Sequence, residues 1–477
     1  MKQFLRSIAL LTAFITVYSQ AHSQYLVSSE YKSSTQALFL GIIPAIPAQY
    51  NVDFYKITYN TVNTAGEPTV ASGGVAIPVA AACNSFPMIA YCHGTVLRQL
   101  DVPSEENLEG FLTKVLASPG YIAVAPDYLG LGENPGIHPY VHAESEATAT
   151  IDLIRATREF LEAETDLQDN GEVMITGYSQ GGQGAMATLE YAQENGLIDE
   201  LGIIAGAPCS GPYDLSGSQA EVLLSDQPYS SPGYIIYLLM SYELAYGNIY
   251  NELSDIIKSP YDEQVLPFFD GAQNTFDMGA VNAILPNQIS DLLVDSVYTN
   301  IQTNPNHPLW VALEANDTFN WTPEIPIRMF YCTGDEQVNF QNSLTADSAM
   351  NANGAADVAS ANSLAGATHG ECIQPALTDA FEFFVSIATP CDLVSSVKEN
   401  ELLKLEIYPN PTSEVLNINI PEKNGFLIVQ DTYGRVVMER NVTQGSTSLN
   451  VGSLAAGTYV VSFQFEKTIR RSVVVIN

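Results

Sequence analysis

The feature that most constrains the fold is the alternation, from Pro87 onward, of short apolar runs with segments of helical pattern. Chains in which strand and helix candidates alternate form mostly parallel sheets with crossover helices. The strand candidates are residues 87–92, 121–125, 172–176, 201–205 and 327–331. The helix candidates between them are residues 146–161 and 180–193. The sequence therefore predicts an α/β domain, which we place at residues 24–391.

The alternation stops between Ser216 and about Asn320, where aromatic-rich segments such as 234–242 and 289–298 have a helical pattern. An insertion of about a hundred residues between two strands is too long for a loop and is usually functional. We therefore expect a helical cap over about residues 216–320.

The composition changes again after the last helix, which Pro390 and Cys391 close. Residues 392–403 form a polar linker, and residues 404–477 hold short β-rich runs, with a hairpin turn expected at Tyr433-Gly434. The runs are 416–420, 426–429, 436–438, 458–463 and 473–476. They predict a small all-β sandwich.

The amino terminus has the three parts of a secretory signal peptide. Lys2 and Arg6 supply the positive charge, residues 8–17 the apolar core, and residues 21–23 a small-x-small cleavage site. The apolar run is shorter than the roughly 20 residues that a bilayer span requires. We expect residues 1–23 to be removed on export, and we expect no transmembrane anchor.

Export places the six cysteines in an oxidising compartment, where an even number favours disulfides. Fifteen complete pairings are possible, so the connectivity stays open. One hypothesis pairs Cys372 with Cys391, which flank the final helix. No Cys/His spacing fits zinc, and residues 166–171 lack the ligand pattern of a calcium loop and favour a turn before a strand. We expect no metal and no cofactor.

The charge balance excludes one class of partner. The chain has 18 basic and 53 acidic residues among 477, a formal net charge of −35. Residues 24–400 carry nine of the basic and 46 of the acidic residues. A surface this acidic repels phosphates and anionic headgroups, so nucleic acid is not an expected partner. With 46% hydrophobic residues, the chain is also too apolar to be disordered.

The sharpest motif is Gly177-Tyr178-Ser179-Gln180-Gly181, which follows an apolar strand and opens a helix. This is the setting of a nucleophile elbow, in which a tight turn presents a serine and needs small flanking residues. The helix that starts at Gln180 directs its first amides toward a developing oxyanion. Ser179 is therefore the candidate nucleophile.

A serine nucleophile needs a histidine base, which in this chain order follows the serine. Only His307 and His369 follow Ser179, and His307 lies in the expected cap. His369 is therefore the candidate base, expected in a loop before the final helix.

The imidazole needs an orienting carboxylate. Asp335 lies just past the strand at 327–331, where loop residues face the site of an open parallel sheet. Glu336 and Asp347 are the competing acids, and position favours Asp335.

Acyl transfer also needs two backbone N–H donors for the oxyanion, one after the nucleophile and one after an early strand. These correspond to Gln180 and Thr95. Gly94 allows the backbone to turn the Thr95 N–H inward. We expect His93 to shape this loop by hydrogen bonding rather than to act as a base.

With these motifs in place, residues 87–388 resemble the α/β-hydrolase superfamily, and within it the secretory lipases. The resemblance rests on residues 93–95, 126–132, 138–143, 177–182, 316–317, 321–323 and 334–338. It implies an α/β-hydrolase fold, a helical lid and hydrolysis of acylglycerols or similar esters. It also assigns catalytic roles to Ser179, Asp335 and His369.

The tail resembles the sorting domain of the type IX secretion system of Bacteroidetes. Its motifs are residues 408–411, 433–435 and 454–459. The resemblance implies that the type IX machinery is a partner, and that the protein crosses the periplasm and then the outer membrane to reach the cell surface or the medium. The alternative is a carbohydrate-binding or adhesive sandwich.

The leading hypothesis is a secreted serine hydrolase of carboxylic esters, a lipase or carboxylesterase that forms an acyl-enzyme. The alternatives are a peptidase of the same fold and a non-catalytic surface binding protein. The aromatic segment 234–246 either lines an acyl groove or packs the cap, and the sequence leaves this open.

Overall fold

The computed structural model describes residues 25–43, 45–79, 83–225, 227–269, 277–388, 390, 403–420, 424–431, 435–465 and 468–476. The expected signal peptide, Cys391, most of the expected linker and the expected turn at Tyr433-Gly434 lie outside these residues.

A nine-stranded sheet forms the first part of the chain, in the order β1-β2-β3-β5-β4-β6-β7-β8-β9. The strands are β1 Leu26–Thr35, β2 Asn51–Val62, β3 Pro68–Val79, β4 Ser85–Cys92, β5 Ile122–Pro126, β6 Gln168–Tyr178, β7 Ile203–Cys209, β8 Ile327–Tyr331 and β9 Val358–Asn362. The first three pair antiparallel, and β3 meets β5 antiparallel, whereas β5, β4 and the strands beyond them are parallel. The predicted parallel sheet is confirmed, with an antiparallel extension at one edge.

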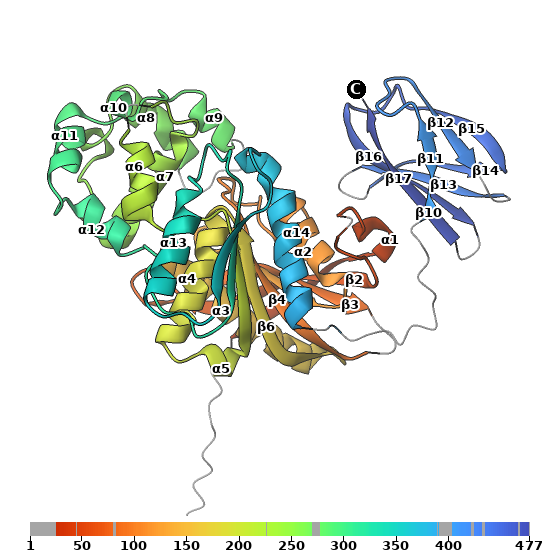
Figure 1. Cartoon of the computed structure of the whole chain (residues 1–477), viewed down its shortest axis with the longest axis horizontal. Coiled ribbons are helices and arrows are strands. Elements are labelled where there is room, and N and C mark those ends of the chain that lie inside the picture. The colour runs from red at the N-terminus through yellow and green to blue at the C-terminus, as the bar shows by residue number, and fades with distance from the viewer. Residues whose placement is uncertain are drawn as a thin grey trace, which may run out of the picture.

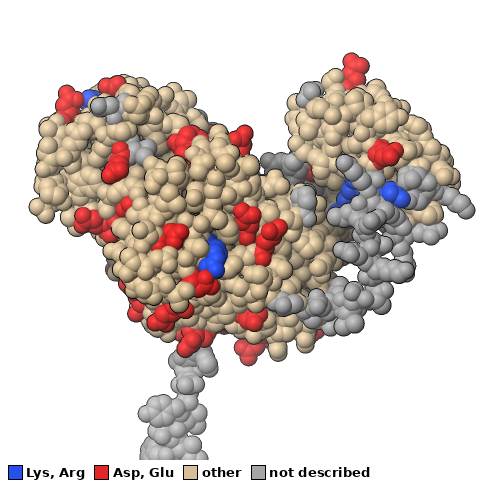
Figure 2. Space-filling model, viewed as in Figure 1, with Lys and Arg blue, Asp and Glu red and all other residues tan. Residues whose placement is uncertain are grey.

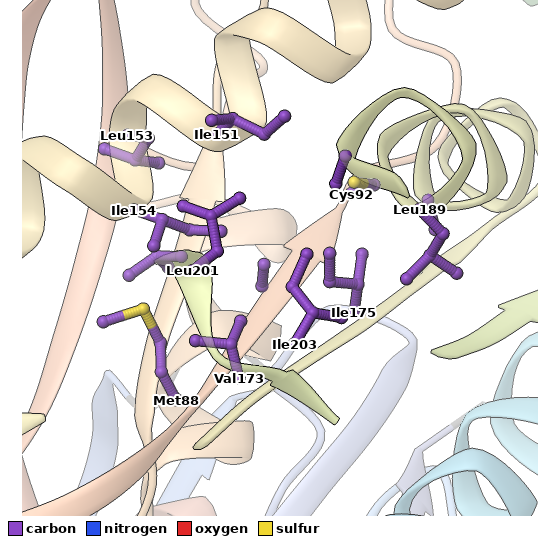
Figure 3. Close-up of a cluster of buried hydrophobic side chains, with 14 of the residues drawn as sticks. Met88, Cys92, Ile151, Leu153, Ile154, Val173, Ile175, Leu189, Leu201 and Ile203 are labelled. Atoms are coloured by element: carbon purple, nitrogen blue, oxygen red, sulfur yellow. The ribbon is translucent and has the colours of Figure 1, made fainter. Parts of the chain in front are cut away.

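Helices cover both faces of this sheet because successive residues of a buried strand point to opposite sides. Met88 and Ala90 of β4 join one core, with α3, α4 and α13, whereas Ile89 and Tyr91 join the other, with α2 and α14. Figure 3 shows part of the first core, between α3, α4 and the strands. The helices are α1 Ala37–Leu40, α2 Leu108–Ala117, α3 Ala143–Glu164, α4 Gln180–Glu194, α5 Ile198–Leu201, α13 Gln341–Ala352 and α14 His369–Ile387.

Between β7 and β8 the chain forms short helices with a core of their own, at the upper left of Figure 1. We refer to residues 215–314 as the insertion. Its helices are η1 Leu215–Gln219, α6 Ala220–Leu223, α7 Gly233–Tyr246, η2 Leu253–Asp255, α8 Tyr261–Val265, η3 Leu266–Phe268, α9 Met278–Asn282, α10 Ile289–Leu292, α11 Asp295–Thr303 and α12 Pro308–Glu314. The predicted helical character of this segment is confirmed.

The tail folds as two sheets around a separate core, and their strands pair antiparallel except for β10, which pairs parallel with β17. One sheet has five strands in the order β10-β17-β16-β13-β14, and the other has three, in the order β11-β12-β15. The strands are β10 Leu403–Lys404, β11 Glu406–Tyr408, β12 Val415–Ile420, β13 Gly425–Asp431, β14 Val436–Val442, β15 Gly445–Asn450, β16 Gly457–Phe465 and β17 Thr468–Ile476. The predicted all-β sandwich is confirmed.

Two local expectations were wrong, and a third was right only in part. Residues 201–205 do not form one strand, because α5 ends at Leu201 and β7 starts at Ile203. His369 is the first residue of α14 rather than a loop residue. The turn expected over residues 166–171 is shorter than predicted, because only residues 165–167 separate α3 from β6, and residues 168–171 already belong to β6, with a register shift against β4.

Two surface properties complete the description. Figure 2 shows acidic side chains spread over the visible face, with few basic ones among them. Within the described residues, none of the helices has both the length and the apolar character needed to span a bilayer.

Candidate active site

Ser179 lies at the tight turn between β6 and α4. Its backbone has φ 62° and ψ −122°, a conformation that costs energy for a residue with a side chain. A Cβ atom at Gly177 would overlap the Gly181 backbone, and one at Gly181 would overlap the Cys92 carbonyl. These overlaps explain why glycine stands on both sides of the serine.

The structure brings Ser179, His369 and Asp335 into one hydrogen-bonded chain. His369 Nε2 lies 2.9 Å from Ser179 Oγ, and His369 Nδ1 lies 2.7 Å from Asp335 Oδ2. All three side chains are buried. In this order a carboxylate can orient an imidazole, and the imidazole can accept the serine proton.

The Asp335 carboxylate is fixed by its own loop. The backbone N–H groups of Gln337 and Val338 donate to Asp335 Oδ1 at 3.0 and 2.8 Å, which leaves Oδ2 for the imidazole. The competing acids make different contacts. Glu336 Oε2 accepts from the His369 backbone N–H at 3.1 Å, and Asp347 Oδ2 accepts from Ser360.

His369 is held at the start of α14 from several sides. Tyr178 Oη donates to the His369 carbonyl oxygen at 2.6 Å, and a capping box between Thr368 and Glu371 closes the first turn. The Glu336 contact adds a carboxylate at the amino end of the helix, where the helix dipole favours negative charge. The ring is therefore positioned by a helix end rather than by a loop.

A disulfide joins the segments that carry Asp335 and His369. Cys332, three residues before Asp335, is bonded to Cys372, three residues after His369. The hypothesis of a Cys372–Cys391 disulfide was therefore wrong. Cys83 is also disulfide-bonded, whereas Cys92 and Cys209 are free and buried, so the expected disulfides form but not all six cysteines take part in them.

Two backbone N–H groups near Ser179 have no hydrogen-bond partner among the described residues, those of Gln180 and Thr95. Gln180 is the first residue of α4, so its N–H precedes the helical hydrogen-bond ladder. The loop of Thr95 packs on the elbow, since a Cβ at Gly94 would lie 3.5 Å from the Tyr178 carbonyl oxygen. Both are free to bind an oxyanion.

His93 has the environment expected of a residue that shapes this loop. Its ring nitrogens lie 2.7 Å from the Gly94 carbonyl oxygen and 3.3 Å from that of Asp127. Burial lowers the pKa of His93 to about 4, so the ring is neutral at pH 7. Among the described residues, no hydrogen bond joins its ring to the Ser179 hydroxyl.

A pocket opens from Ser179 into the insertion, and the space in it that no atom fills is about 890 Å³ with the open solvent at its mouth included. Apolar side chains of the insertion make up most of its wall: Leu215, Ala220, Leu224, Ile235, Leu238, Leu239, Ile289, Leu293, Ile301, Leu309, Trp310 and Leu313. Trp310 donates its ring N–H to the Ile301 carbonyl oxygen, so its polar atom is satisfied. No charged side chain is among the described residues that line the cavity.

Three polar side chains that line this cavity are bound to the loop of Asp335. Tyr234 Oη donates to Gln337 Oε1 at 2.9 Å, and Tyr229 Oη and Gln219 Nε2 donate to the Gln337 carbonyl oxygen at 3.1 Å each. Tyr140 Oη is hydrogen-bonded to Thr95 Oγ1 at 3.1 Å. These groups are therefore engaged with protein partners, and the cavity offers a bound molecule mainly apolar contact.

The aromatic segment of α7 answers the question that the sequence left open. Tyr234 and Leu238 line the cavity, whereas Tyr237 and Tyr242 are buried in the core of the insertion. The segment does both.

Two contacts that support the site were not predicted from the sequence. The first is the disulfide between Cys332 and Cys372, because fifteen complete pairings left the partners open. The second is the contact of the buried Glu146 side chain with Gln180, which gave no local signal.

Comparisons with known proteins agree with this geometry. The family model of secretory lipases matches residues 103–371, more than half of the chain, and the model of the secretion system C-terminal sorting domain matches residues 406–477. No curated protein matches the chain.

Among solved structures, a rice cell wall degrading esterase, LipA from Xanthomonas oryzae, is 30% identical, with a TM-score of 0.67 over 76% of this chain and 97% of that one. A hydrolase from Legionella pneumophila is 24% identical, with a TM-score of 0.69 over 76% of this chain and 98% of that one. Lipase A of Candida antarctica shares the fold, at 17% identity and a TM-score of 0.53, over 72% of this chain and 77% of that one.

Proposed function

Because the chain belongs to the secretory lipase family, we propose that it cleaves fatty acyl esters, with Ser179 as nucleophile, His369 as base and Asp335 as its orienting acid. The single observation that carries the assignment is the continuous hydrogen-bonded chain from Ser179 Oγ through both imidazole nitrogens to Asp335 Oδ2. Family membership and the esterase neighbours establish a secreted lipase or esterase, and the roles of the three residues are our proposal.

In the first half-reaction Ser179 Oγ attacks the ester carbonyl carbon as its proton passes to His369 Nε2. The negative charge on the carbonyl oxygen is bound by the N–H groups of Gln180 and Thr95. The C–O bond to the alcohol then breaks, and the imidazolium gives its proton to the departing oxygen. Water repeats these steps on the acyl-enzyme and releases the carboxylic acid.

Asp335 orients the imidazole and holds the proton on His369 Nδ1, so that Nε2 faces the serine. The two N–H donors on Asp335 Oδ1 fix the carboxyl group in this position.

The cavity supports a long acyl chain as the group bound next to the serine. Transfer of apolar surface from water contributes about 0.8 kcal/mol per buried CH₂, and the cavity wall has little to offer a polar substituent. A peptide is a poorer fit, because none of the described lining residues carries a charge that could hold its amino terminus. We propose that the insertion acts as the acyl-binding cap.

The tail supports export through the type IX secretion system, because the sorting-domain model covers residues 406–477. We propose that residues 1–23 first direct the chain to the periplasm and that the tail then directs it across the outer membrane. Deletion of residues 404–477 should leave active enzyme in the periplasm, measured by ester hydrolysis in cell fractions. Normal surface or extracellular activity of that variant would contradict this route.

Ser179→Ala tests the central assignment. The variant should lose at least about a thousandfold in kcat on p-nitrophenyl acyl esters and should not be labelled by a fluorophosphonate. Ser343→Ala is the matched control, since Ser343 is a buried serine on α13 away from the elbow. A folded Ser179→Ala protein with the wild-type rate would overturn the proposal.

A further inference from the structure

The Gln180 side chain is buried and donates to two acceptors. Gln180 Nε2 lies 2.7 Å from Glu146 Oε1 and 2.6 Å from His138 Nε2. His138 Nδ1 lies 2.8 Å from the Leu129 carbonyl oxygen, which only accepts, so Nδ1 carries the proton and Nε2 is free to accept. The amide of Gln180 is thus fixed by a carboxyl group and a neutral imidazole.

The same carboxyl oxygen holds a second residue of the cavity wall. Glu146 Oε1 also accepts from the Val141 backbone N–H at 3.1 Å. Val141 has a φ of 57°, a strained conformation for a β-branched residue, and it lines the cavity beside Ser179. One buried carboxyl group therefore ties together Gln180 and a strained segment next to it.

Glu146 has an environment that favours its neutral form. Its side chain is fully buried, and within the described residues no Lys or Arg forms an ion pair with it. Burial raises the pKa of Glu146 to about 8, against the opposing hydrogen bonds from Gln180 and Val141. The space around it is tight, since a Cβ at Gly184 would lie 2.6 Å from Glu146 Oε2.

We propose that Glu146 is a positioning residue of the oxyanion hole: its carboxyl group fixes the Gln180 side chain and thereby the direction of the Gln180 backbone N–H. The inference rests on the proposed function, because it is the oxyanion of ester cleavage that this N–H would bind. A neutral acid suits the position. An ionised one would place a second negative charge close to the developing oxyanion and oppose it.

The groups that face Glu146 do not titrate in the range where it would. Burial lowers the pKa of His138 to about 3 and of His142 to about 4, and it raises the pKa of Cys92 to about 12. Four neighbouring tyrosines also have pKa values raised far above their usual range by burial: Tyr128, Tyr140, Tyr237 and Tyr242. An ionisation near pH 8 at this place therefore belongs to Glu146.

The structure gives matched variants for the test. Glu146→Gln keeps an oxygen acceptor for the Gln180 amide but cannot ionise, whereas Glu146→Ala removes the acceptor. Glu190→Gln is the control, because Glu190 lies on the same helix as Gln180 and burial also raises its pKa to about 8. Within the described part of the chain, the Gln180 amide is hydrogen-bonded to Glu146 and His138 rather than to Glu190.

We expect kcat of the wild type to fall above about pH 8, and Glu146→Gln to keep its neutral-pH kcat within about threefold while losing that fall. Glu146→Ala should lower kcat about tenfold or more with little change in KM, since a misplaced oxyanion donor weakens the transition state. Glu190→Gln should behave as the wild type does. An unchanged alkaline fall in Glu146→Gln, or a wild-type kcat in folded Glu146→Ala, would overturn the proposal.

A second readout does not depend on activity. The raised pKa means that native Glu146 keeps a proton that the unfolded chain loses above about pH 4.5, so stability falls as pH rises toward about 8. Urea unfolding at pH 5 and pH 9 should show a smaller loss of stability for Glu146→Gln than for the wild type. An equal loss would contradict a neutral Glu146, whereas a wild type that hydrolyses no ester would overturn the proposed function instead.

Discussion

The sheet and the insertion meet at Ser179, where the sheet contributes polar groups and the insertion contributes apolar ones. From the sheet come the polar groups, each fixed by hydrogen bonds: Ser179 at the end of β6, Asp335 after β8 and His369 at the start of α14. From the insertion comes an apolar wall whose few polar atoms are bound to protein partners. The sheet is therefore suited to chemistry and the insertion to selection of the substrate.

The two regions also have separate cores. The residues of the insertion pack in a cluster of their own, distinct from the two clusters on the faces of the sheet. Cavity walls of this kind tolerate hydrophobic exchanges of similar volume, whereas a hydrogen-bonded triad loses activity when one atom moves. We expect changes in the insertion to alter substrate preference, and changes at the sheet to alter the rate for every substrate.

The largest effect should come from Asp335→Asn. The amide can leave His369 in the wrong tautomer, so kcat should fall by about 10⁴ for short and long esters alike. Esters from butyrate to palmitate at pH 8 provide the measurement. Asp347→Asn is the control, because that acid accepts from Ser360 and Asn351 rather than from the imidazole, and its kcat should stay within about threefold. A larger loss in the control than in Asp335→Asn would reassign the acid.

A smaller effect should follow from Cys332→Ala combined with Cys372→Ala. The disulfide closes a separation of 40 residues, so its loss should lower the free energy of unfolding by about 3–4 kcal/mol. It should also lower kcat about tenfold at every chain length, since the acid and base segments gain freedom. Thermal unfolding and the same ester series measure both effects.

Cys92→Ala is the control for this double variant, as Cys92 is buried without a disulfide. If the double variant kept its kcat below its melting temperature, the disulfide would support stability alone and would not position the acid and base.

The turn at Ser179 could be predicted because its motif is local, and the order of Ser179, Asp335 and His369 could be predicted because it only requires their positions along the chain. A glycine-flanked serine between a strand and a helix and a histidine late in the chain can be read without knowing any contact. The disulfide could not be predicted, because six cysteines allow fifteen pairings and only the fold brings Cys332 to Cys372.

The antiparallel edge, formed by β1, β2 and β3, was not predicted. In β3 the strand pattern is weakened by Gly73 and Gly74, because glycine in the interior of a strand has no side chain to pack. A Cβ at Gly73 would lie 2.6 Å from Leu153 of α3, so the glycine is there to let a helix approach the strand. Tertiary packing explains why glycine stands at position 73, and no local sequence pattern reveals this packing.

Tertiary contacts also explain the boundary errors in the insertion. Residues 289–298 read as one helix, but the chain is extended at Leu293 and Val294 between α10 and α11. Leu293 forms a β-bridge with Ile257, and the Val294 N–H donates to the Ile256 carbonyl oxygen at 3.0 Å. These distant partners compete with the local helical hydrogen bonds. The helical character of the segment was therefore predictable, whereas the points at which its helices end were not.

We expect the smallest change in rate from Ala220→Phe. This variant is also the sharpest test of whether the insertion selects the substrate while the sheet carries out the chemistry. Ala220 is buried and lines the cavity, so a larger side chain there takes space from a long acyl chain. We expect kcat/KM for palmitate to fall about tenfold, with butyrate within about threefold, because one or two displaced methylenes are worth about 1–3 kcal/mol. Ala315→Phe, at an exposed residue that follows α12, should leave both esters unchanged. An equal loss on both esters in Ala220→Phe would mean that the insertion also positions the reacting groups, through the bonds of Gln219, Tyr229 and Tyr234 to the Asp335 loop. In that case substrate selection by the insertion and catalysis by the residues of the sheet would not be separable in this fold.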